Sequence, residues 1–351
     1  MSDKKTLYIV GAGASKEAGL PTGYELKEKI ASLVDIRFRY GSEFISGDRL
    51  IYNALEVYVK KPEIQEKDVN PYLHAAWRIR DAMPQAISID NFIDAHNDDK
   101  KIELCGKLAI VRSILEAERD SKLYIDLSNS NNRLNFRAIE ETWYANFLKL
   151  LTENCTKKNI AKRLGSIALI VFNYDRCIEH FLYNSLQNYY GFQHDEVINL
   201  INEIEIYHPY GVVGSLPWQG GLSVAFGAEI NPYNLLNLAQ QIKTFTEGTD
   251  PQSSEILAIR KNVTNAHRVV FLGFAYHKLN MELLKPDGPI LESSNVRSCF
   301  GTAKGISNSD CEIIKFEINS NYKHSMIACE IRNELDCHQL FKEYWRSLSL
   351  N

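Results

Sequence analysis

Short uninterrupted apolar runs are the clearest pattern along the chain, and each has the length of one strand. Such runs fit the strands of a parallel sheet that helices cover on both faces. They occupy residues 7–10 and Ile167–Phe172, and a further run follows Arg268 in the predicted interior strand Arg268–Leu272. Glu203–Tyr207 and Glu312–Ile318 alternate in polarity and predict two more strands, while Tyr24–Val34 and Asp175–Leu186 have helical spacing. We therefore expect an α/β fold, with a Rossmann-like parallel sheet, helices on both faces and ligands outside the carboxyl edge.

A long stretch without clear strands, about residues 40–164, interrupts this alternation. Four segments within it have helical apolar spacing: Leu50–Val59, Tyr72–Met83, Lys101–Glu118 and Phe136–Thr152. Asp126–Arg133 is rich in Ser and Asn and predicts a loop. We interpret 40–164 as a large helical insertion over a nucleotide site. It would interrupt a single domain, 1–351, whose core is residues 1–36 and 165–351. Ala328–Leu348 predicts an amphipathic final helix.

Composition narrows the classes of function. The 351 residues carry a net charge of -4, so the chain lacks the cationic excess typical of binding to nucleic acid or to an anionic membrane. Its longest apolar runs are too short to span a bilayer, and the polar N-terminus predicts no signal peptide. Seven scattered cysteines predict reduced thiols in the cytoplasm. None of them forms a C-x-x-C pair, so we expect no zinc ribbon and no metal site.

The segment Gly11-Ala12-Gly13-Ala14-Ser15 joins the first apolar run to a helix-compatible stretch. In such a unit the glycines admit a phosphate to the backbone, and free amides and the helix dipole face the anion. A tight turn without a ligand is the alternative. A dehydrogenase fingerprint would have its third glycine where this chain has Lys16. The next glycine instead begins Gly19-Leu20-Pro21-Thr22. This pattern resembles the first motif of the sirtuin superfamily, whose members bind NAD and cleave its nicotinamide–ribose bond.

Asn173 and Asp175 follow the apolar run 167–172, with Tyr174 between them. Capping of the next helix is the simpler role for Asp175. The pair resembles the sirtuin motif in which Asn and Asp, separated by one residue, follow a strand. That resemblance implies that Asn173 orients the ribose and the attacking water, while Asp175 supports the loop.

His208 follows the next predicted strand and precedes a loop that begins Pro209-Tyr210-Gly211. An imidazole titrates near neutrality and can act as a general base, although a structural histidine fits the same position. The segment resembles the sirtuin motif in which the catalytic His precedes Gly and Ser. Here Pro209 and Tyr210 separate His208 from the glycine. The resemblance implies His208 as the base, because tyrosine is a poor base at neutral pH.

Two further segments carry the same resemblance. Gly273 and Phe274, after the strand 268–272, are similar to the late nucleotide-contacting motif of bacterial sirtuin-like proteins. His277 lies close behind them and fits a structural or adenosine-side role. In the insertion, Ser88-Ile89-Asp90-Asn91-Phe92 resembles a short motif of the same proteins, and it also fits a helix N-cap.

Taken together, these motifs resemble the sirtuin-like domains of bacterial anti-phage defence proteins. The resemblance implies an NAD hydrolase that releases nicotinamide and ADP-ribose, with the pyrophosphate on Gly11–Ser15 and with Asn173 and His208 as catalytic residues. It also implies a homo-oligomer, or an ATPase or nucleic-acid-sensing partner that keeps the enzyme silent until infection. Two alternatives stay open: a nucleotide or ADP-ribose sensor without turnover, and a zinc-free NAD-dependent protein deacylase.

Overall fold

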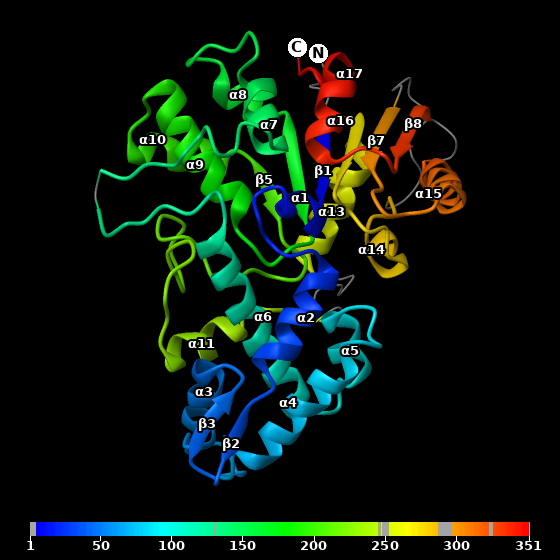
Figure 1. Cartoon of the computed structure of the whole chain (residues 1–351). Helices are drawn as coiled ribbons and strands as arrows, with labels where there is room; N and C mark the ends of the chain where they lie inside the picture. The colour runs from blue at the N-terminus through cyan, green and yellow to red at the C-terminus, as the bar shows by residue number, and fades with distance from the viewer. Residues whose placement is uncertain are drawn as a thin grey trace.

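Within the described residues, six parallel strands form the central sheet, in the order β5-β4-β1-β6-β7-β8 (Figure 1). They belong to a computed structural model that describes residues 5–129, 131–244, 247, 253–286, 297–322 and 326–350. The strands are β1 Thr6–Val10, β4 Ile167–Val171, β5 Glu205–Tyr207, β6 Arg268–Leu272, β7 Arg297–Thr302 and β8 Met326–Arg332. The chain runs outward from β1 to β5, crosses back to β6 and then runs outward to β8. Doubly wound dinucleotide-binding folds share this order, so the predicted fold class is confirmed.

Two apolar cores lie on the two faces of the sheet. Successive residues of a strand point to opposite faces, so Leu7 and Ile9 enter one core while Tyr8 and Val10 enter the other. Burial on both faces explains the uninterrupted apolar runs of β1, β4 and β6. The first core also contains residues of α13 (Ser254–Asn265), α14 (Lys278–Leu283) and α15 (Asn308–Asn321). The second contains residues of α1 (Ala12–Lys16), α7 (Trp143–Thr152), α8 (Ile160–Leu164), α9 (Cys177–Tyr190), α10 (His194–Asn202), α16 (Cys337–Glu343) and α17 (Trp345–Leu348).

A helical body continues the first core at one end of the molecule, opposite the two chain termini (Figure 1). Its helices are α2 (Gly23–Leu33), α3 (Arg49–Val59), α4 (Asn70–Ala82), α5 (Ile89–Ala95), α6 (Lys100–Asp120) and α11 (Pro232–Ala239). The long helix α6 packs against α2, α3, α4, α5 and α11. A hairpin of β2 (Arg37–Arg39) and β3 (Glu43–Ser46) completes this body. By contrast, α7 packs against α8 and α9, and residues of all three belong to the core on the sheet's second face.

Several predicted elements differ from the structure. The predicted strand Glu312–Ile318 is wrong, because these residues belong to α15. The predicted final helix is wrong over its first part, since residues 328–332 belong to β8 and α16 begins only at Cys337. The helix predicted over Phe136–Thr152 begins at Trp143. The hairpin β2–β3 and the strand β7 were not predicted. No helix in the described part of the chain is long and apolar enough to cross a membrane.

Candidate functional site

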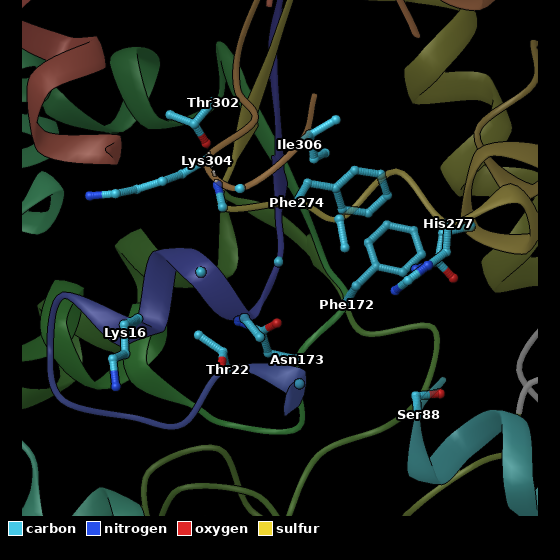
Figure 2. Close-up of a pocket in the computed structure, with 18 of the residues that line it drawn as sticks. Lys16, Thr22, Ser88, Phe172, Asn173, Phe274, His277, Thr302, Lys304 and Ile306 are labelled. Atoms are coloured by element: carbon cyan, nitrogen blue, oxygen red, sulfur yellow. Dashed lines mark hydrogen bonds between the residues drawn. The ribbon is translucent and has the colours of Figure 1, made fainter. Parts of the chain in front are cut away.

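A cavity of about 730 Å³ lies at the carboxyl edge of the sheet (Figure 2). The segments that follow the six strands of the sheet line it, and α5 adds residues from the helical body. The strand order reverses between β1 and β6, which is where doubly wound folds bind their ligands. The volume lies in the usual range of small-molecule and cofactor pockets. The topology alone thus brings the segments after all six strands to one cavity.

Three glycines in this cavity are explained first by backbone packing. A Cβ on Gly11 would lie 2.6 Å from the carbonyl oxygen of Gly273, and one on Gly13 would lie 2.9 Å from the same atom. Gly273 has φ +55°, and a Cβ there would lie 2.0 Å from the amide nitrogen of Ala14. The amides of Gly11 and Gly13 donate to the carbonyls of Leu272 and Gly273, each at 2.9 Å. The loops after β1 and β6 therefore cross in direct contact, and this crossing requires glycine whether or not a phosphate binds.

Asn173 enters the cavity from the end of β4, and Ser15 fixes its side chain. The Asn173 Nδ2 donates to Ser15 Oγ at 3.0 Å, and that hydroxyl donates to Asp175 Oδ2 at 2.8 Å. The other oxygen of Asp175 accepts the Cys177 amide at 3.1 Å, at the start of α9. All three side chains are buried. Ser15 takes one of the two Nδ2 hydrogens, so the amide oxygen and the second Nδ2 hydrogen of Asn173 can serve a ligand.

His208 lies behind Asn173 and is absent from the described lining of the cavity. Its Nδ1 is 3.3 Å from the Asn173 carbonyl oxygen, and its Nε2 is 2.7 Å from Glu179 Oε1 on α9. Burial opposes the charged imidazolium, but the Glu179 carboxylate outweighs this and raises the pKa of His208. Burial likewise opposes the charge on Glu179, and His208 overcomes it and lowers the pKa of that carboxyl. Donation to both partners requires the imidazolium, so this geometry favours the charged form of His208.

The predicted nucleotide-contacting residues fall into two sets. Gly11, Ala12, Gly13, Thr22, Gly273 and Phe274 line the cavity. Ala14, Ser15, Gly19, Leu20, Pro21 and Asp175 do not appear in its described lining. Ala14 and Leu20 instead belong to the second core, and Ser15 and Asp175 support Asn173. The loops singled out in the sequence do meet at this cavity, but the sequence could not separate residues that face the cavity from those that support them.

Three lysines and three aspartates line the cavity. Lys16 pairs with Glu25, whose carboxylate also accepts the Thr22 amide at 2.8 Å and so caps α2. Lys278 and Lys304 are exposed at the ends of other loops. Figure 2 shows Lys304 beside Thr302, on the far side of Phe274 from Ser88. Asp336 caps α16 by accepting the Gln339 amide at 2.8 Å. Among the described residues, no group of three or more His, Cys, Asp or Glu could hold a metal ion.

Asp90, the second residue of α5, lines the cavity although the sequence gave it no defined role there. Its Oδ1 accepts the hydroxyl of Tyr174, the residue after Asn173. Burial raises the pKa of Asp90 to about 6. The signal in the sequence was the segment 88–92, which also behaves as the expected N-cap, because Ser88 Oγ accepts the Asn91 amide at 3.0 Å.

Tyr210 and Asn280 also line the cavity and were missed. The Tyr210 hydroxyl donates to Asn280 Oδ1 at 2.5 Å, which joins the loop after β5 to α14. No sequence motif pointed to this contact, since the two residues lie 70 positions apart.

Comparison with known proteins leaves the family open: no protein-family model matches this chain, and no curated protein matches its sequence.

Proposed function

We propose that this protein binds NAD in the cavity and hydrolyses the bond between nicotinamide and ribose. The observation that carries the proposal is the meeting of the loops after β1, β4 and β6 around one cavity at the reversal of strand order. That position suits a dinucleotide. The sirtuin-like motifs Gly11–Ser15, Asn173–Asp175 and Gly273–Phe274 belong to those same loops.

Asn173 has the geometry that the proposed reaction needs. Cleavage of the N-glycosidic bond develops positive charge on the ribose, so the site must hold the sugar and bring a water to its C1′ atom. The Asn173 amide is fixed by Ser15, and its oxygen can accept a hydrogen bond from a ribose hydroxyl or a water. A prearranged acceptor of this kind costs little reorganisation during the reaction. His208 would act through the Asn173 backbone, which it contacts directly.

His208 does not belong to the described lining of the cavity, and this position favours a second candidate function. That candidate is a nucleotide or ADP-ribose sensor without turnover. A base that is paired with Glu179 at 2.7 Å would have to leave that carboxylate before it could accept a proton from water. Under this reading the cavity binds NAD or ADP-ribose and releases no nicotinamide.

One experiment separates the two candidates. Purified protein is incubated with NAD, and nicotinamide and ADP-ribose are followed by chromatography beside a binding titration with each nucleotide. Hydrolysis predicts release that is lost in Asn173→Ala and kept in Asn199→Ala, the same change at an exposed residue of α10. Binding without release would favour the sensor. Absence of both binding and release would refute the NAD proposal.

An NAD hydrolase of this kind would serve as an effector of anti-phage defence, because its activity depletes the NAD of an infected cell. Such an effector must be held silent before infection, which is why we also propose a homo-oligomer or a sensing partner. Mass measurement of the purified protein, alone and after addition of NAD, tests the first of these.

A further inference from the structure

The end of the cavity beside Asn173 is built around one carboxylate. Asp90 extends from α5, and its Oδ1 accepts the hydroxyl of Tyr174. Because Tyr174 directly follows Asn173, this bond joins Asp90 to the residue next to the ribose-orienting amide. Figure 2 shows the start of α5, at Ser88, on the side of the site where Phe172 and His277 lie. Asp90 and Asn173 therefore serve the same end of the cavity.

The groups around Asp90 leave its carboxylate suited to proton transfer. Tyr174 and Tyr210 face it from the loops after β4 and β5, and Asp94 follows one turn later on α5. His277 and Lys278 line the same cavity from the loop after β6. Burial raises the pKa of Asp90 to about 6, so the group is mostly ionised at neutral pH and can still hold a proton briefly. Partial burial lowers the pKa of His277.

We propose that Asp90 is the catalytic carboxylate of this site, facing the glycosidic bond and taking the proton of the attacking water. The proposal rests on the proposed NAD hydrolysis. In the step, the water oxygen bonds to C1′ of the ribose while the C1′–N bond breaks. The bonding electron pair goes to the pyridinium nitrogen, so nicotinamide leaves neutral. The water proton moves to Asp90 and then to solvent.

With Asp90 as the base, the reaction does not require His208 to face the cavity. The imidazole is occupied by Glu179 and by the Asn173 carbonyl and lies outside the described lining, whereas Asp90 lies in that lining. A carboxylate also suits the charge of the reaction, because it is attracted to the pyridinium of the substrate and to the positive ribose that forms as the bond breaks. A substrate whose base carries no positive charge would be stabilised less by the Asp90 carboxylate.

The test compares Asp90→Asn with Asp98→Asn, the same change at an exposed position just after α5. Asparagine keeps the size of the side chain and an acceptor for Tyr174, and thermal unfolding checks that both variants fold. Three quantities are measured: nicotinamide release across pH 4.5–9, the Kd for NAD, and the Kd for its reduced form, which lacks the pyridinium charge. We expect Asp90→Asn to lower kcat by about 10²–10⁴-fold. The rate of nicotinamide release by the wild type should fall as pH drops below about 6, where Asp90 becomes protonated. In Asp90→Asn this decrease at low pH should be absent.

The outcomes distinguish this proposal from the proposed function. A wild type that binds neither form of NAD refutes both. Normal kcat and an unchanged pH profile in Asp90→Asn, with NAD hydrolysed by the wild type, overturn only the role of Asp90. If the wild type binds NAD without turnover, a preference for the oxidised form that disappears in Asp90→Asn supports the placement of the carboxylate. An unchanged preference overturns it.

Discussion

Replacement of Glu118 by glutamine tests how the helical body is held to the loops that follow β4 and β5. Glu118 lies on α6 and Arg176 lies at the start of α9, and the two form an ion pair with almost no exposed surface. The Arg176 Nη1 also donates to the Val224 carbonyl at 2.6 Å, and Glu118 Oε2 accepts the Gly227 amide at 2.9 Å. This one pair therefore joins α6, the segment after Asn173 and the loop that follows β5.

The expected cost follows from burial. Glutamine removes the negative charge and leaves the guanidinium buried beside neutral groups, a change that costs about 3–5 kcal/mol. A chain of 351 residues has an unfolding entropy of about 0.7 kcal/mol per K, so Tm should fall by about 4–7 °C.

The assay is thermal unfolding at neutral pH, with Glu229→Gln as the matched control. Glu229 pairs with Arg119 but is 86% exposed, so its loss should change the free energy of unfolding by about 0.5 kcal/mol or less. If Glu118→Gln unfolds at the same temperature as Glu229→Gln, then the buried pair does not fasten these segments and the reasoning is wrong.

Two further predictions concern the loops around the cavity. Gly273→Ala should unfold at a clearly lower temperature than Gly191→Ala, because both have positive φ but only Gly273 would place a Cβ against the Ala14 backbone. Equal decreases in unfolding temperature for the two variants would contradict the close contact between the loops after β1 and β6. The His208–Glu179 pair should stabilise the fold most between about pH 4.5 and 6.5, the ordinary pKa values of the two groups. At pH values below this window, the pair's contribution to the free energy of unfolding should decrease as Glu179 is protonated at its lowered pKa. At pH values above the window, it should decrease as His208 loses its proton at its raised pKa. Denaturant unfolding of wild type and His208→Gln at pH 5–9 should therefore show a difference that narrows as pH rises, and a constant difference would exclude this coupling.

The fold class could be predicted because the central strands are buried on both faces. β1, β4 and β6 consist of continuous apolar runs, and such runs need no knowledge of their partners. Helices α2, α3 and α4 were found because each turns one apolar side toward a core. Helix α6 was found from its helical apolar spacing, and the structure buries it on most sides.

Residues 312–318 and 328–332, in α15 and β8, show where the local sequence pattern fails to predict the structure. In residues 312–318 the alternation suggested a strand, but Ile313 and Phe316 are exposed while Cys311, Ile314 and Ile318 are buried. The buried spacing of three and four residues is helical, and Ser307 caps the helix by accepting the Asp310 amide at 3.1 Å. Residues 328–332 are a strand because they pair in register with β7, a contact that local sequence does not reveal.

The sequence by itself determined the inner strands β1, β4 and β6, the glycine turns and the loops that carry the candidate site, because these depend on local periodicity and on the conformations that glycine allows. Only the tertiary structure decided which side chains in those loops face the cavity. It paired His208 with Glu179, and it brought Asp90 to Tyr174 across 84 residues of sequence. Such contacts depend on how distant elements pack, and packing is a property of the whole fold rather than of any segment.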